Sequence, residues 1–127
     1  FHGREHLNVN AWMKALESGK PKTRLAFDHG ITGINSVIIG ESSIQYQAAF
    51  DIELPSELEY LNSVVIDGTE LFHKLMDYKA TYFVPTNGPF NLRLEETLKQ
   101  AGIKYMMLDK LQKEKQKTDQ QCRGKIS

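Results

Sequence analysis

The segment 80–108 constrains the fold more strongly than any other part of this chain. Residues 80–84 are β-branched or aromatic, apart from one alanine, and stop at Pro85, which predicts a short strand. Apolar residues at helical spacing predict a helix over 91–101, and residues 103–108 predict a second strand. A strand, a helix and a strand joined by short loops form a unit with parallel strands. The expected fold class is therefore α/β.

Two amphipathic helices are expected ahead of this unit. The first covers about 8–18, where apolar residues recur at i, i+3, i+4 and i+7. The second covers 55–77 and starts beside Ser56 and Glu59, which form an S-x-x-E capping box. Gly68 falls on the apolar stripe of this second helix. Because glycine has no side chain, we expect a neighbouring segment to approach the helix closely there.

The stretch 20–54 between these helices is harder to assign. Residues 24–27 suit either a short strand or a turn of helix. The β-branched run 37–39 predicts a brief strand. Over 44–52 every second residue is apolar, a period that suits an extended, half-buried segment. We interpret 31–54 as an insertion of short extended pieces and loops.

Composition bounds the class of protein. The chain has 127 residues, 40% of them apolar and 25% charged, which suits one globular domain or part of a larger one. Its 16 basic and 16 acidic residues balance, so no net positive field draws nucleic acid. No apolar run approaches the ~20 residues that cross a bilayer. Cys122 is the only cysteine, which excludes an intrachain disulfide and favours a reducing, cytoplasmic compartment.

The two ends of the chain carry separate expectations. The sequence begins at Phe1 rather than Met, which suggests a piece of a longer protein. Residues 109–127 hold six Lys or Arg against three Asp or Glu, and we expect a polar, mobile tail there.

The sequence His2-Gly3-Arg4-Glu5-His6 holds the best candidate for a metal site. Two histidines four residues apart share one face of a helical turn. Their Cβ atoms are then about 6 Å apart, so both imidazoles can reach one cation. Neutral imidazole suits zinc and related divalent metals. The zinc-protease motif H-E-x-x-H is excluded, because Gly3 stands where it needs Glu. Two ligands are too few for a catalytic zinc, and a chance surface pair is the alternative.

Two further places could carry chemistry. Asp28 follows a short apolar run and could supply a third metal ligand or a general base; a turn capped by this carboxylate is the alternative. The loop after the strand at 80–84 contains Pro85, Asn87 and Gly88, whose amides could bind a substrate oxygen. The alternative is a rigid strand-to-helix turn in which Asn91 is the N-cap.

Three stretches, at residues 2–6, 26–30 and 82–91, resemble the polysaccharide deacetylase family, also called the NodB-homology family. H-G-R-E-H at 2–6 resembles its H-[ST]-x-x-H metal motif, with Gly3 in place of Ser or Thr. Residues 82–91 are similar to its R-P-P-Y-G strand-end loop, without the Arg. With A-F-D-H-G at 26–30, these stretches look like a bacterial branch tied to surface-polysaccharide synthesis.

The resemblance implies part of a distorted (β/α) barrel that hydrolyses an acetyl group from a carbohydrate substrate. It implies a divalent metal, often zinc, which polarises the acetyl carbonyl and activates water. His2 and His6 would be metal ligands. Pro85, Asn87 and Gly88 would form one wall of the substrate site.

The chain departs from the family in ways that leave its activity open. The T-F-D-D motif, which supplies a metal ligand and the general base, is absent, and so is the L-x-H motif of the general acid. Asp28 in F-D-H-G looks like an altered T-F-D-D, but it follows the histidine pair instead of preceding it. Either the chain is a fragment of the domain, or the protein has lost catalysis and is a glycan-binding or interaction module.

Overall fold

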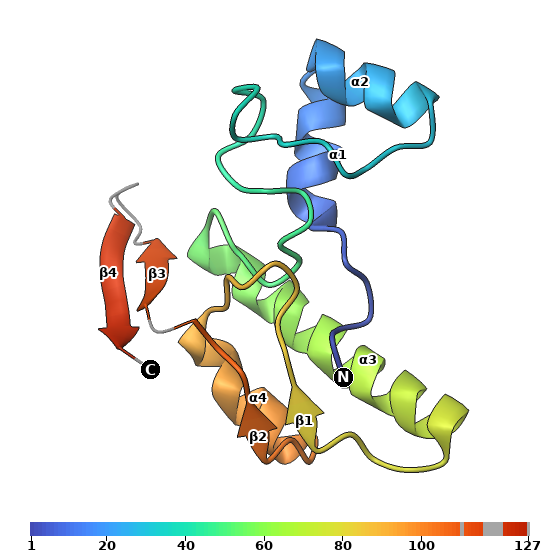
Figure 1. Ribbon diagram of the computed structural model, residues 1–127, viewed down its shortest axis with the longest axis vertical. Coiled ribbons are helices and arrows are strands. Elements are labelled where there is room, and N and C mark those ends of the chain that lie inside the picture. The colour runs from blue at the N-terminus through green and yellow to red at the C-terminus, as the bar shows by residue number, and fades with distance from the viewer. Residues whose placement is uncertain (110, 116–120, 127) are drawn as a thin grey trace.

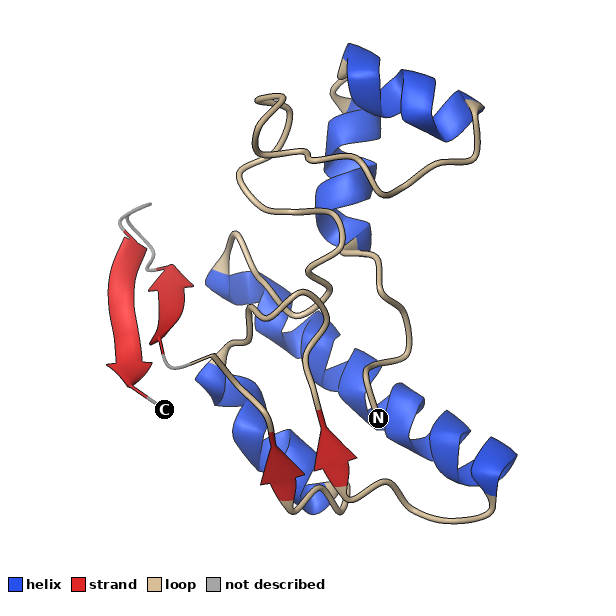
Figure 2. Cartoon of the chain, in the orientation of Figure 1, coloured by secondary structure: helices blue, strands red, loops and turns tan. Residues whose placement is uncertain are grey.

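The computed structural model describes residues 1–109, 111–115 and 121–126. Along the longest axis, α1 and α2 lie at one end, whereas α3, α4 and the β1–β2 pair lie towards the other (Figure 1). Figure 2 shows a long irregular connection between α2 and α3. The elements in chain order are α1 (Val9–Glu17), α2 (Pro21–Asp28), η1 (Pro55–Glu57), α3 (Leu58–Met76), β1 (Tyr82–Phe83), η2 (Leu92–Leu94), α4 (Glu95–Gln100), β2 (Tyr105–Met106), β3 (Leu111–Lys115) and β4 (Gln121–Ile126).

Strands β1 and β2 pair in parallel, which confirms the predicted strand–helix–strand unit. Tyr82 lies beside Tyr105, and Phe83 lies beside Met106. The helical segment η2–α4 connects the two strands, as parallel pairing requires. Regular pairing covers two residues in each strand, fewer than the sequence predicted. The larger (β/α) barrel stays a prediction.

The N-terminal residue extends this pair on the side of β1 opposite β2. The Phe1 nitrogen donates to the Tyr82 carbonyl at 2.9 Å. The Val84 N–H donates to the Phe1 carbonyl at 3.1 Å. One residue bonded to both neighbours of Phe83 is the pattern of a parallel ladder. Phe1, β1 and β2 therefore run side by side in the same direction.

Aromatic rings form the centre of the main core, which lies between this sheet, α3 and α4. Phe83 is fully buried, and its ring lies 5.9, 5.1 and 5.6 Å from the rings of Phe1, Phe50 and Phe90. The close approach predicted at Gly68 is confirmed. A Cβ atom added to Gly68 would lie 3.0 Å from the Phe1 ring, so this glycine lets the N-terminal segment lie directly on α3.

A second, smaller core lies under α1 and α2. Trp12 is buried there, with its ring edge-on to Tyr46 at 5.0 Å. The first helix matches its prediction, and the Asn8 side chain caps it by accepting the Ala11 N–H at 3.1 Å. Residues 24–27 are helical rather than extended.

The connection 31–54, all of which the structure describes, contains no helix or strand, as the loop interpretation predicts. The predicted strand at 37–39 is wrong. These residues form a turn, with Val37 and Ile38 exposed by 45% and 80%. The apolar residues that alternate over 44–52 are buried, but turns interrupt the segment and no strand forms.

The start of the long helix differs in detail from its prediction. The Glu57 carboxylate accepts the N–H groups of Glu53 at 2.8 Å and Leu54 at 2.6 Å. Because η1 begins one residue after Leu54, Glu57 occupies the third position, from which a side chain reaches back to the cap. The observed capping pair is therefore Leu54 and Glu57, two residues before the predicted pair Ser56 and Glu59.

The predicted polar tail at 109–127 is described in part. β3 and β4 pair antiparallel within it. Residues 110, 116–120 and 127 lie outside the described residues, so mobility of the tail stays a prediction.

Helix α2 takes its N-terminal cap from the connection that follows it. The Glu41 carboxylate accepts the N–H groups of Lys22 at 3.1 Å and Thr23 at 2.7 Å, and the Thr23 hydroxyl at 2.8 Å. Burial alone would raise the pKa of Glu41. These hydrogen bonds and the nearby Lys22 charge outweigh that effect and hold its pKa below the ordinary value of 4.5.

A pH dependence follows from this cap. A lowered pKa in the folded state means that Glu41 stabilises the fold above about pH 4.5. This contribution is lost as the pH falls through the lowered pKa. We expect urea unfolding at stepped pH to show a shallower acid loss of stability in Glu41→Gln than in the wild type. Parallel curves for the two proteins would contradict the assignment.

Candidate functional site

The candidate site lies where the parallel segments end. His2 follows Phe1, the loop 85–88 follows β1, and Asp109 lies beyond the end of β2. The carboxyl ends of neighbouring parallel strands lie on one edge of a sheet, where α/β proteins bind their ligands. The Phe1 pairing provides an extended residue directly before His2. The candidate site therefore lies at the carboxyl edge of this parallel pair.

His2 is held by the backbone of the neighbouring strand end. Its Nδ1 lies 2.7 Å from the Val84 carbonyl oxygen. A carbonyl only accepts hydrogen bonds, so Nδ1 carries the proton and donates it. Nε2 of the neutral ring then keeps its lone pair for a ligand. In metal-binding histidines, the ring nitrogen that does not bind the metal commonly donates its N–H to a group such as a backbone carbonyl.

The rings of His2 and His6 lie against each other in an exposed turn. Their centroids are 5.2 Å apart and their planes make an angle of 65°. Zinc–nitrogen bonds of about 2.1 Å place two imidazoles of one tetrahedral ion roughly 5 Å apart, centroid to centroid. The separation therefore fits a shared ion. The predicted helical turn is wrong, because residues 2–6 form an irregular bend.

Gly3 explains how the bend brings the two rings together. Its φ of 123° lies in the region that favours glycine. A Cβ atom at this position would also lie 2.9 Å from the ring of Phe50. The Ser or Thr of the family motif would therefore be strained in this backbone.

The loop after β1 is a rigid turn whose parts differ in accessibility. The Gly88 N–H lies 3.4 Å from the Pro85 carbonyl. Thr86 is buried, and its hydroxyl accepts the Ala49 N–H at 2.9 Å. Pro85 is buried, whereas Asn87, with a positive φ of 55°, is exposed. Of the three predicted substrate contacts, Asn87 has the most accessible side chain.

Two neighbours complete this loop. A Cβ atom at Gly88 would lie 2.5 Å from an Asp109 oxygen, so the loop lies directly on this carboxylate. Asn91 accepts the Arg93 N–H at 2.9 Å and is the N-cap of η2. The strand-to-helix turn weighed as the alternative is thus present. It does not exclude a role for the exposed Asn87.

Asp28 is not part of this arrangement. It is the exposed last residue of α2, at the far end of the molecule from β1 (Figure 1). In the part of the chain that the structure describes, no three His, Cys, Asp or Glu side chains are placed to hold one ion. The described residues thus offer His2 and His6 as a pair of zinc-type donors, without a third ligand beside them.

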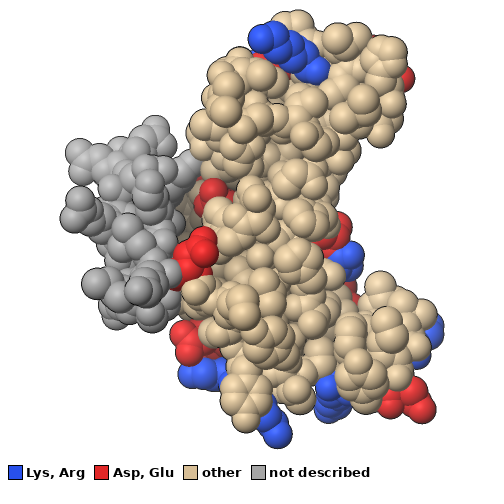
Figure 3. Space-filling view, viewed as in Figure 1, with Lys and Arg blue, Asp and Glu red and all other residues tan. Residues whose placement is uncertain are grey.

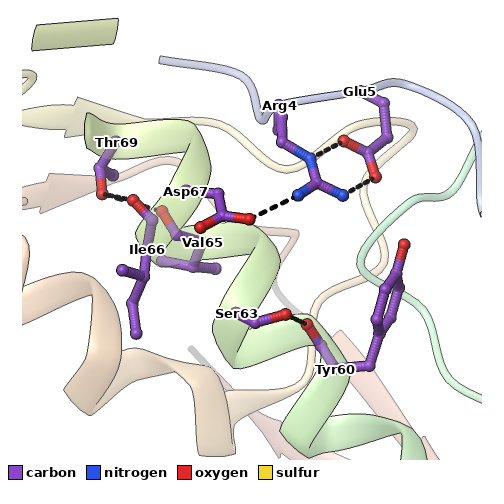
Figure 4. Close-up of polar contacts among 8 residues, drawn as sticks. All are labelled: Arg4, Glu5, Tyr60, Ser63, Val65, Ile66, Asp67 and Thr69. Carbon is purple, nitrogen blue, oxygen red and sulfur yellow. Dashed lines mark hydrogen bonds and ion pairs between the residues drawn. The ribbon is translucent and has the colours of Figure 1, made fainter. Parts of the chain in front are cut away.

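A charged cluster underlies the bend that carries the histidines (Figure 4). The Arg4 guanidinium bonds both oxygens of Glu5, at 2.6 and 2.8 Å, and one oxygen of Asp67 at 2.9 Å. The hydrogen bonds to Glu5 raise the pKa of Arg4 above its ordinary range, so it stays charged. No sequence pattern indicates Asp67, because its contact with Arg4 spans 63 residues.

Charge elsewhere is mixed. On the face seen in Figure 3, acidic and basic side chains of the described residues are interspersed and do not gather by sign. Among the helices that the structure describes, none is long and apolar enough to span a membrane.

Comparisons with protein-family models, with curated proteins and with solved structures found no match for this chain.

Proposed function

We propose that this chain contributes His2 and His6 as two ligands of a divalent metal, in a carbohydrate deacetylase of the polysaccharide-deacetylase type. The observation that supports the proposal is the ring separation of 5.2 Å, with Nδ1 of His2 engaged by the Val84 carbonyl. Zinc is the favoured metal, because neutral imidazole nitrogens suit it. The resemblance of residues 2–6 and 82–91 to two motifs of that family, in the same order along the chain, supports the choice of carbohydrate as substrate.

The donor set is incomplete for catalysis. A catalytic zinc has three protein ligands and an open position, and the described residues place two histidines together. A deacetylase would therefore need a carboxylate as third metal ligand, beyond the two histidines that the described residues place together. The second candidate, a glycan-binding module without turnover, is favoured by this same observation.

We expect Zn²⁺ to bind weakly to this chain and His2→Ala or His6→Ala to lose that binding by tenfold or more. Each variant removes one of two ligands and leaves a single imidazole. Isothermal titration with Zn²⁺ measures the affinity. His73→Ala is the matched control, because His73 is an exposed histidine on α3 that lines a pocket with Thr97 and Gln100 of α4.

Equal affinity in His2→Ala and the wild type would remove the proposal. Acetate release from an N-acetylated amino-sugar oligomer, assayed with added Zn²⁺ on the product of the complete gene, separates the two candidates. Acetate release that a chelator stops supports the deacetylase. Binding of the oligomer without acetate release supports the binding module.

A further inference from the structure

We propose that Arg4 is a positioning residue that holds the bend between His2 and His6 against α3, and that Asp67 is its anchor on that helix. The inference rests on the proposed metal-binding role of the two histidines. It adds a device that sets their separation.

The first support is the geometry of the guanidinium (Figure 4). Its Nε and Nη2 bond the two carboxylate oxygens of Glu5, at 2.6 and 2.8 Å. Its Nη1 bonds Asp67 on α3 at 2.9 Å. A planar fork with fixed donors suits such a paired contact, which the single ammonium of lysine cannot reproduce.

The second support is the packing beneath Arg4. A Cβ atom on Gly68 would lie 3.0 Å from Cβ of Arg4 and 3.2 Å from its backbone nitrogen. The backbone of the bend therefore touches α3 at the residue next to Asp67. The backbone contact at Gly68 and the ion pair with Asp67 involve adjacent residues of α3. Arg4 therefore fixes the position of the bend on this helix.

The third support is where this point lies along the segment. His2 is bonded to Val84 on one side of Arg4. On the other side, the Asn8 side chain donates to the carbonyls of Ala48 and Asp51, at 2.9 and 2.8 Å. Both ends of the segment are thus attached to the fold, and Arg4 attaches its middle. Loss of Arg4 would leave His6 free to move relative to His2.

A purely stabilising ion pair is the alternative. The Asp67 side chain is 59% exposed, and exposed pairs contribute little to stability. The two roles therefore differ in what they predict. A positioning role changes the separation of the two rings and their metal affinity while leaving Tm nearly unchanged.

The test compares the wild type with Arg4→Lys, Arg4→Ala and Asp67→Ala. Lys99→Ala is the control, because it removes the exposed ion pair with Glu95 on α4. The first readout, without metal, is the nuclear Overhauser effect between the ring protons of His2 and His6. The second is the affinity for Zn²⁺, with the Co²⁺ absorption spectrum reporting ligand geometry. Tm is measured for every protein.

We expect the three test variants to lose the ring-to-ring effect and to bind Zn²⁺ about tenfold more weakly, the low end of losses seen when groups that orient metal ligands are removed. The control should keep both. An unchanged ring-to-ring effect in Arg4→Ala and Asp67→Ala would overturn the positioning role. If that effect is lost as expected but the wild type binds no metal, the positioning role stands and the proposed metal function fails.

Discussion

Replacing Phe83 by alanine is expected to lower the free energy of unfolding by about 3–5 kcal/mol, the usual cost of truncating a buried Phe. Phe83 has no exposed surface and contacts three other rings, from Phe1, Phe50 and Phe90. Edge-on and tilted ring pairs contribute beyond the area they bury. The three remaining rings come from separate parts of the chain, so they cannot easily close over the cavity.

Urea denaturation followed by circular dichroism measures the loss. Phe27→Ala is the matched control, because Phe27 is 52% exposed on α2 and its removal should change stability by about 0.5 kcal/mol or less. Phe83→Leu should fall between the two. A loss below about 1 kcal/mol in Phe83→Ala would show that this ring is not the centre of the core.

The elements that could be predicted from the sequence are those set by nearby residues. Helices α1 and α3 follow from apolar stripes at helical spacing, and Asn91 follows as a cap from its place after a strand. The parallel pairing of β1 and β2 follows from one short helical connection. Each of these features follows from a pattern that neighbouring residues of the sequence carry.

The features that could not be predicted depend on contacts that no sequence pattern indicates. Glu41 caps α2 from a loop that sequence patterns do not place. The apolar run with Val37 suits a strand locally, yet no strand among the described residues pairs with it, and Val37 is exposed. The residue type of Asp28 and its place after a short apolar run predict a companion of the histidines. Its helix belongs to the other core, so it lies far from them.

The candidate site shows the same division. The four-residue spacing predicts His2 and His6 side by side on a helical turn, and they lie side by side on an irregular bend instead. The backbone that joins them is an irregular bend because Gly3 takes a positive φ. The hydrogen bond from His2 to Val84 joins residues 82 positions apart, and it depends on the sheet having formed.

The second large effect concerns Gly68, where the N-terminal segment crosses α3. A Cβ atom would meet the Phe1 ring and the Arg4 side chain at 3.0 Å and the Arg4 backbone at 3.2 Å. Gly68→Val adds three carbons at this point. The ring of Phe1 can shift, but the Arg4 backbone cannot move without lifting the bend from the helix. We expect overpacking to cost about 1–3 kcal/mol in the free energy of unfolding.

Helix propensity acts in the opposite direction, which makes a control necessary. Valine is a better helix former than glycine, by a few tenths of a kcal/mol. The difference between Glu70→Gly and Glu70→Val, at an exposed position two residues further along α3, gives the gain from glycine to valine without the crossing. Urea denaturation of these two variants and of Gly68→Val isolates the steric cost.

The same substitution tests how the core is coupled to the histidine pair. Because Gly68 supports Phe1 and Arg4, lifting the bend should also break the contact of His2 with Val84. We therefore expect Gly68→Val to lose the ring-to-ring signal of His2 and His6, while Glu70→Val keeps it. If Gly68→Val folded with full stability and an intact histidine pair, the N-terminal segment would not lie against α3. The position of the candidate site on this sheet edge would then be wrong.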